Sequence, residues 1–169
     1  MRQMTGKQSI SFAKAVYIEG SAAIVGEKEK DGPLGEYFSH TLSDPMCGQE
    51  SWEEGESELQ LATAKLAMQK ANVRPEQIRM IFAGDLLAQS IASSFGLVDL
   101  NCPLYGLFGA CSTMGEAMIL GAMAAGAGYA DRVLALASSH FASAERQFRF
   151  PLAYGNQRPQ STTWTVTGC

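Results

Sequence analysis

The chain has 169 residues, of which 46% are hydrophobic and 18% are charged, which is enough material for one packed globular core. Its formal net charge is −4 and no run of lysines or arginines occurs, which argues against nucleic acid or anionic lipid as the main partner. The four cysteines lack Cys-x-x-Cys spacing and no secretory leader is recognisable, so we expect reduced thiols rather than disulfides. Neither histidine has a second ligand-type residue at helical spacing, and we expect no metal site and no cofactor.

The first third of the chain predicts a strand, a long loop and a helix. Ser9–Ile18 mixes polar and apolar residues and predicts the first strand. A charged loop containing Asp31-Gly32-Pro33 follows and is expected to be exposed. Ser51 and Glu54 have the spacing of a capping box, in which each residue can satisfy backbone N–H groups of the other, so a helix should begin there and run to about Ala71.

The rest of the chain alternates apolar strands with helices. The predicted elements are strand Arg79–Ala83, helix Leu86–Leu97, strand Leu104–Phe108, helix Ser112–Gly128, strand Arg132–Ala137 and strand Thr162–Val166. Strands that are apolar throughout and alternate with helices are typical of a parallel sheet covered on both faces. We therefore predict an α/β fold with a mostly parallel, five-stranded sheet.

The helix Ser112–Gly128 is the most distinctive of these elements. It is apolar on every side and carries no charge between Glu116 and Asp131, which predicts that it is a buried central helix. The uncharged stretch is shorter than the roughly 18 residues needed to cross a bilayer, so the burial should be inside protein. No transmembrane segment is predicted elsewhere in the chain.

Cys111 opens this helix, directly after a strand and a tight turn. The first turn of a helix has unpaired N–H groups and a partial positive charge, which favour a thiolate and can hold an anion. Cys111 is therefore a candidate nucleophile or anion-binding residue, the alternative being a small residue that only packs.

Other candidates also follow predicted strands, where ligands of parallel α/β sheets bind. His140 could act as a base for Cys111 or orient a ligand, although it could equally make a structural hydrogen bond. Arg146 and Arg149 could hold a carboxylate between them, or pair with nearby acids. Asp85 could face a ligand or cap the next helix.

Several motifs resemble known families. Ala83–Leu87 (AGDLL) and Phe108–Thr113 (FGACST) resemble the thiolase and ketoacyl-synthase superfamily, in which a nucleophilic cysteine opens a buried helix. Four further motifs are similar to the stage V sporulation protein AD family of spore-forming bacteria: Lys30–Gly35 (KDGPLG), Ser138–His140 (SSH), Ala144–Arg149 (AERQFR) and Thr165–Gly168 (TVTG). Together these motifs span nearly the whole chain.

The resemblance implies a thiolase-like layered fold in which residues 1–169 form a single N-terminal lobe, cut before a second, similar lobe. It also implies a non-catalytic role in binding dipicolinic acid, with or without calcium, during its transport into or out of the spore. The protein would then lie in the spore or forespore, peripheral on the inner membrane, beside the membrane proteins of the stage V sporulation A operon. Dipicolinate is a flat dianion, which a helix N-terminus and arginines would suit, and the proposed contacts are Cys111, Asp85, His140, Arg146 and Arg149.

Two other hypotheses remain open. Cys111 could be the nucleophile of an acyltransferase of the thiolase or ketoacyl-synthase kind, although the histidine or asparagine partners that the superfamily draws from its second lobe are not in this sequence. Alternatively, the chain could self-associate as a homodimer through the apolar helix and imitate a two-lobed parent.

Overall fold

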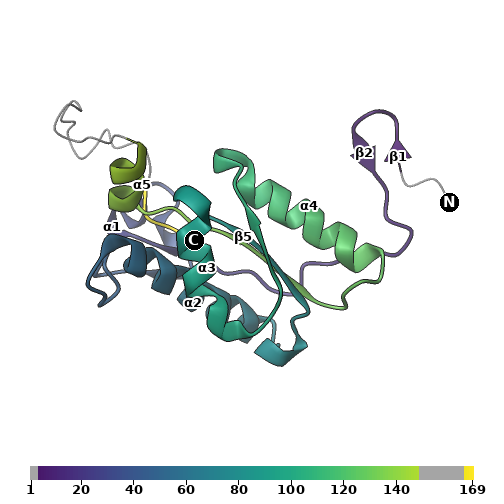
Figure 1. The fold of residues 1–169 in the computed structure, drawn as a ribbon, viewed down its shortest axis with the longest axis horizontal. Helices are drawn as coiled ribbons and strands as arrows, with labels where there is room; N and C mark the ends of the chain where they lie inside the picture. The colour runs from purple at the N-terminus through teal and green to yellow at the C-terminus, as the bar shows by residue number, and fades with distance from the viewer. Residues whose placement is uncertain (1–3, 149–165) are drawn as a thin grey trace.

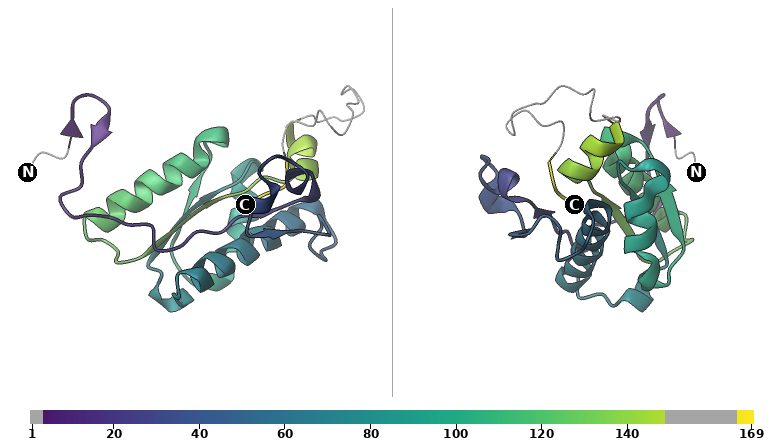
Figure 2. Two further views of the ribbon diagram at one scale, coloured as in Figure 1. Left: turned by 180° about the vertical axis from the view of Figure 1, so that it is seen from behind. Right: turned by 60° about the vertical axis from the view of Figure 1, so that its left-hand side comes forward.

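A three-stranded parallel sheet forms the centre of the computed structural model, which describes residues 4–148 and 166–169 (Figure 1). The strands are β5 (Met80–Gly84), β6 (Leu104–Leu107) and β7 (Val133–Ala137), in the order β6-β5-β7. All three lie close to their predicted positions, because each is an apolar run bounded by turn residues. Helix α4 (Thr113–Gly126) lies on one side of the sheet, while α2 (Trp52–Lys70) and α3 (Ile91–Gly96) lie on the other (Figure 2).

The alternation of side chains along the strands divides the core into two layers. One face of the sheet packs with α2 and α3 in a cluster of buried residues: Ala64, Ile81, Ala83, Leu97, Leu134 and Leu136. The opposite face presents Phe82 and Val133 to α4, where a Cβ atom on Gly121 would lie 3.0 Å from Val133 Cγ2. A glycine at position 121 therefore lets α4 lie directly on the sheet.

The sheet continues beyond β7 through single bridges rather than through a full ladder. Gly168 forms antiparallel bridges to both Ser139 and Val25, so the end of the chain lies between β7 and β3 (Ile24–Val25). Strand β3 also pairs in parallel with β4 (His40–Thr41). A continuous ladder of five strands is not seen in the described residues. The predicted strand Thr162–Val166 lies outside them except for Val166, which is in no strand.

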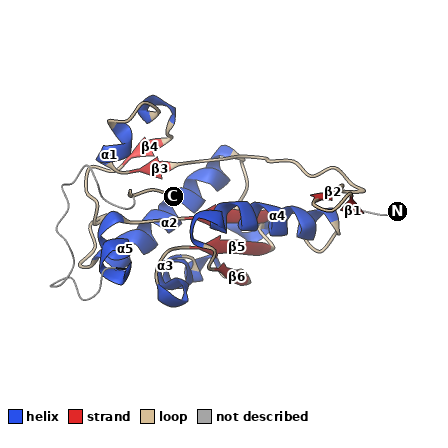
Figure 3. Ribbon diagram, turned by 90° about the horizontal axis from the view of Figure 1, so that it is seen from above, coloured by secondary structure: helices blue, strands red, loops and turns tan. Residues whose placement is uncertain are grey.

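The predicted first strand, Ser9–Ile18, is wrong. Only Ser9–Ile10 is extended and paired, as β2, and its partner is β1 (Met4–Thr5) in an exposed antiparallel hairpin. Figure 3 shows this hairpin at the opposite end of the molecule from α1 (Glu27–Lys30) and α5 (Phe141–Phe148). The mixture of polar and apolar residues predicted a longer strand, but a segment becomes a strand only where a neighbouring edge pairs with it, and here that holds for Ser9–Ile10.

Helix α2 begins as predicted. Ser51 Oγ accepts a hydrogen bond from the Glu54 N–H at 3.2 Å and donates one to Glu54 Oε2 at 2.9 Å. The helix predicted at Leu86–Leu97 is shorter in the structure, because Gln89 and Ser90 have φ values of 62° and 52° and interrupt it. The short 3-10 turns are η1 (Gly35–Tyr37), η2 (Pro75–Gln77), η3 (Ala88–Ser90), η4 (Val98–Leu100) and η5 (Ala110–Ser112).

The expectation that α4 is buried on every side is corrected by the structure. Only Thr113, Ala117 and Gly121, which face the sheet, are buried. The outer face carries five exposed apolar side chains: Met114, Met118, Ile119, Leu120 and Met123. The composition of the helix predicts burial, whereas in this chain no described element covers its outer face.

Candidate functional site

The carboxyl ends of β5 and β7 meet helices α2, α3 and α5 at a group of buried polar side chains. We call this group the buried polar cluster, and it consists of Glu56, Gln60, Asp85, Ser93, Ser138 and Ser143. Asp85 follows β5 and Ser138 follows β7, so the topology of the sheet brings them together. Buried polar groups destabilise the folded state unless they are hydrogen-bonded, and each side chain of this cluster is hydrogen-bonded to another member of it.

Asp85 is a capping residue in this structure. Its Oδ1 accepts a hydrogen bond from the Leu87 N–H at 2.8 Å, and its Oδ2 accepts from the N–H and the hydroxyl of Ser93 at 2.8 and 2.7 Å. The carboxylate thereby satisfies an N–H group in the first turn of α3, where negative charge is favoured. Of the two roles considered for Asp85 from the sequence, helix capping is the one that its contacts support.

Glu56 links α2 to the segments after β7. Its Oε1 accepts from the Ser138 hydroxyl at 2.7 Å, and its Oε2 accepts from the Ser143 hydroxyl at 2.6 Å. Burial raises the pKa of Glu56 to about 7, with the nearby charge of Asp85 adding to the increase, while the two serine hydrogen bonds oppose it. This carboxyl group therefore gains and loses its proton near neutral pH.

Gln60 joins the two acidic halves of the cluster. Its Nε2 donates to the hydroxyls of Ser138 and Ser93 at 2.7 and 3.0 Å. Sequence reasoning missed Glu56 and Gln60 as a pair. Their spacing of four residues places them on one face of α2 and could have identified them.

His140 is buried and holds the beginning of α5. Its Nδ1 accepts hydrogen bonds from the N–H groups of Ala142 and Ser143 at 3.2 and 3.5 Å, so its Nε2 carries the proton and donates to the Pro45 carbonyl at 2.8 Å. Burial lowers the pKa of His140, which favours this neutral form. Both ring nitrogens are therefore engaged within the chain, and none of the hydrogen bonds found in the described part joins His140 to Cys111.

Of the two candidate arginines, the structure describes Arg146. Arg146 lies on α5 and forms an ion pair with Glu53 of α2, with half of its side chain exposed. This pairing with a nearby acid was the alternative considered for Arg146 from the sequence. Arg149 lies outside the described residues.

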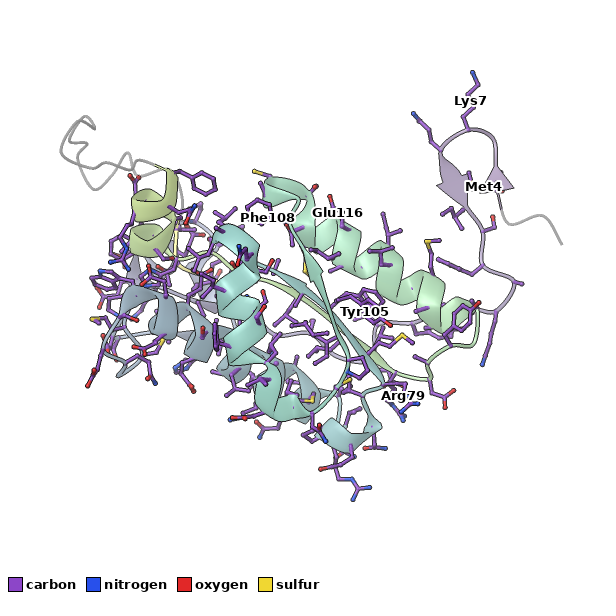
Figure 4. All side chains as sticks on the ribbon, viewed as in Figure 1. Met4, Lys7, Arg79, Tyr105, Phe108 and Glu116 are labelled. Carbon is purple, nitrogen blue, oxygen red and sulfur yellow. The ribbon has the colours of Figure 1, made fainter. Side chains whose placement is uncertain are left out.

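Cys111 is exposed in η5, immediately before α4, as the sequence predicted. The turn is fixed by a hydrogen bond from the Ser112 hydroxyl to the Gly109 carbonyl at 2.8 Å. The Glu116 carboxylate shares this hydroxyl proton as a second acceptor and lies against Gly109, at the end of α4 labelled in Figure 4. The first turn of α4 thus already has a carboxylate beside it, with which an anionic ligand would have to compete.

The structure describes four of the five predicted contacts, and no hydrogen bond or ion pair found in the described part joins any two of these four. Asp85 and His140 act as caps, Arg146 pairs with Glu53, and Cys111 is exposed at a different helix. Their roles as ligand contacts stay predictions. Among the residues that the structure describes, no group of three or more histidine, cysteine or acidic side chains could hold a metal ion. A search of the same residues finds no helix that is long and apolar enough to span a membrane.

Comparisons with known proteins identify the class and then the family. The crystal structure of the priming β-ketosynthase from the R1128 polyketide biosynthetic pathway superposes with a TM-score of 0.50, at 17% identity, over 73% of this chain and 41% of the ketosynthase. The chain therefore has a thiolase-like α/β fold. The Stage V sporulation protein AD (SpoVAD) family model matches residues 6–169. Stage V sporulation protein AD of Bacillus subtilis (strain 168) is 41% identical over 166 residues, which cover 98% of this chain and 49% of that protein. The chain belongs to the stage V sporulation protein AD family and spans about half the length of this relative.

Proposed function

We propose that this sporulation protein binds dipicolinic acid, with or without calcium, as a non-catalytic part of the machinery that moves dipicolinate into and out of the spore. Membership of the stage V sporulation protein AD family supports a role in sporulation. The ligand would be a rigid dianion, so the site should offer N–H donors and positive charge rather than a deep apolar pocket.

The observation that carries this proposal is the exposed turn at Cys111, which directly precedes α4 and which no hydrogen bond found among the described residues joins to His140. A thiol nucleophile in acyl transfer needs a base within hydrogen-bonding reach. His140 is neutral and uses both nitrogens within the chain. The N–H groups at the start of α4 remain suited to binding a carboxylate, with arginines supplied by the segment that follows β7.

We also propose that the chain is the N-terminal lobe of a two-lobed protein. The outer face of α4 is apolar and exposed, and the Bacillus subtilis relative is about twice as long as the matched region. A second lobe packed on α4 would bury this face. In that setting the protein would lie on the spore inner membrane, beside membrane proteins of the stage V sporulation A operon.

The test is calorimetric titration of dipicolinic acid, with and without calcium, into the 169-residue chain and into a two-lobed parent. In the parent, Cys111→Ala and Arg146→Ala should each weaken binding about tenfold. Arg74→Ala, which removes an exposed arginine at η2, is the control and should leave affinity unchanged. Unchanged affinity in both Cys111→Ala and Arg146→Ala would show that the site is elsewhere.

An acyltransferase using Cys111 is the second candidate, because the chain has the fold of a ketosynthase and the thiol is exposed at the start of α4. Intact mass after incubation with an acyl-CoA tests this candidate. Burial raises the pKa of the Cys102 thiol, so Cys102→Ala serves as the matched control. An acyl adduct lost in Cys111→Ala and kept in Cys102→Ala would support catalysis, and no adduct on either protein would support the binding role.

A further inference from the structure

The hairpin β1-β2 stands away from the body of the molecule, with Lys7 at its turn and Met4 on its first strand (Figure 4). Each residue from Met4 to Ile10 is exposed, including the apolar side chains of Met4 and Ile10 at 48% and 38%. Each strand is only two residues long. An isolated hairpin of this size is not stable in water, so it needs a surface to pack against.

The segment after the hairpin fixes its direction. A Cβ atom on Gly126, the last residue of α4, would lie 2.9 Å from Phe12 Cδ1 and 3.4 Å from Val16 Cγ2. Phe12 and Val16 therefore anchor the chain at the C-terminal end of α4. From this anchor the hairpin rises on the side of α4 that faces away from the sheet (Figures 1 and 2).

The outer face of α4 and the hairpin consequently lie on the same side of the molecule. We define residues 4–16, which comprise the hairpin and its anchor, as the N-terminal arm. Both the outer face of α4 and the hairpin carry exposed apolar side chains. Exposed apolar surface of this kind usually marks a packing partner.

We propose that the N-terminal arm packs against the second lobe and holds it on the outer face of α4. This inference rests on the two-lobe proposal above, but it does not depend on dipicolinate binding. The occupant is the proposed second lobe, since the matched region is 49% of the Bacillus subtilis relative. Residues 4–16 contain two basic residues, Lys7 and Lys14, and no acidic one, although the whole chain carries a charge of −4. The surface that the arm meets should therefore be apolar and bordered by carboxylates.

Hydrogen exchange without ligand tests the inference. One sample is the 169-residue chain, and the other is a chimaera in which this chain replaces the matching half of the Bacillus subtilis protein. Amides of residues 4–10 should exchange rapidly in the first sample and at least about tenfold more slowly in the chimaera. In the chimaera, Ile10→Asp should restore fast exchange of the hairpin. Leu34→Asp is the control, because Leu34 is exposed in the loop after α1, at the opposite end of the molecule. This variant should leave the hairpin amides protected.

Equal exchange in the two samples would overturn the inference. Protection that rises with the concentration of the 169-residue chain would overturn it in favour of a second copy, and protection only on anionic phosphatidylglycerol vesicles would overturn it in favour of a lipid surface. If the chimaera does not fold by circular dichroism, the same measurement on the intact Bacillus subtilis relative decides the question. Failure of dipicolinate to bind leaves each of these results unaffected, so the two proposals fail separately.

Discussion

The most informative perturbation in this structure is the removal of the titrating carboxyl group of Glu56. Burial raises its pKa from the ordinary 4.5 of a glutamate to about 7, mainly because the charged form loses contact with water. The folded protein therefore binds the proton more tightly than the unfolded chain does. A difference of this size corresponds to about 3 kcal/mol between the protonation states, at 1.36 kcal/mol for each pKa unit.

The sign of the effect follows from proton binding. Between the unfolded pKa of 4.5 and the folded pKa of about 7, the folded state holds more protons than the unfolded state. The free energy of unfolding should therefore fall as the pH rises through this window, and it should level off above about 7. Above that pH the protein contains an ionised, buried Glu56 that accepts hydrogen bonds from the Ser138 and Ser143 hydroxyls.

The assay is urea unfolding followed by circular dichroism from pH 5 to pH 8.5, for the wild type and for Glu56→Gln. Glutamine has the shape of the protonated acid and can accept from one serine and donate to the other. The variant should match the wild type near pH 5 and should be more stable by about 3 kcal/mol at pH 8.5. Glu58→Gln is the control, because Glu58 lies on the same helix and is only partly buried.

The wild type and Glu56→Gln must be compared directly, because the contribution of buried His140 to stability also depends on pH. Burial lowers the pKa of His140, so its contribution to stability is present at higher pH and is lost as the pH falls through about 6.5. This slope is opposite to that of Glu56, but it is common to the wild type and to Glu56→Gln. A constant difference between these two proteins from pH 5 to pH 8.5 would refute the reasoning about Glu56.

Three further predictions concern Asp85 and helix α4. Asp85→Ala should lower the free energy of unfolding by about 3 kcal/mol, because three hydrogen bonds lose their acceptor, one from the Leu87 N–H and two from Ser93 at the start of α3. Gly121→Leu should destabilise by about 1–3 kcal/mol by forcing α4 away from Val133, whereas Gly115→Ala, where a Cβ meets open space, should stabilise by about 1 kcal/mol. Glu116→Gln in a two-lobed protein should increase dipicolinate affinity about threefold, because a carboxylate no longer competes for the N-terminal end of α4.

Each of these predictions has a result that would contradict it. Thermal or urea unfolding measures the first two, and Asp85→Asn, which retains an acceptor oxygen, should lose less stability than Asp85→Ala. Equal losses for the two variants would show that hydrogen bonding at this cap is not the cause. If Gly121→Leu were as stable as the wild type, the contact of α4 with Val133 would not be tight. Unchanged or weaker dipicolinate binding in Glu116→Gln would place the ligand away from α4.

The parts of the fold that were predicted correctly depend on residues that are close together in the sequence. The capping pair Ser51 and Glu54 predicted the first residue of α2, since a cap is a contact within one turn. The apolar runs predicted β5, β6 and β7, although of the three only the central strand β5 is mostly buried and β6 lies exposed at the edge of the sheet. The position of Cys111 followed from a strand, a turn and a helix in direct succession.

The chemistry around the site depends on residues that are distant in the sequence. The sequence could not show that Glu56 lies against Ser138 and Ser143, because these contacts join positions 82 and 87 residues apart. It allowed two roles for Asp85 and for His140, and the choice depended on which N–H groups the packed helices brought within reach.

The sequence by itself determined the α/β class, the family motifs and the turn at Cys111, since each of these is a local pattern of polarity and backbone preference. Tertiary structure decided which candidate residues are caps, how the carboxyl of Glu56 is buried, and that the outer face of α4 is exposed in this chain. The physical reason is that a side chain's environment is set by whatever packs against it, and an apolar helix predicts only that some partner exists, without specifying which one.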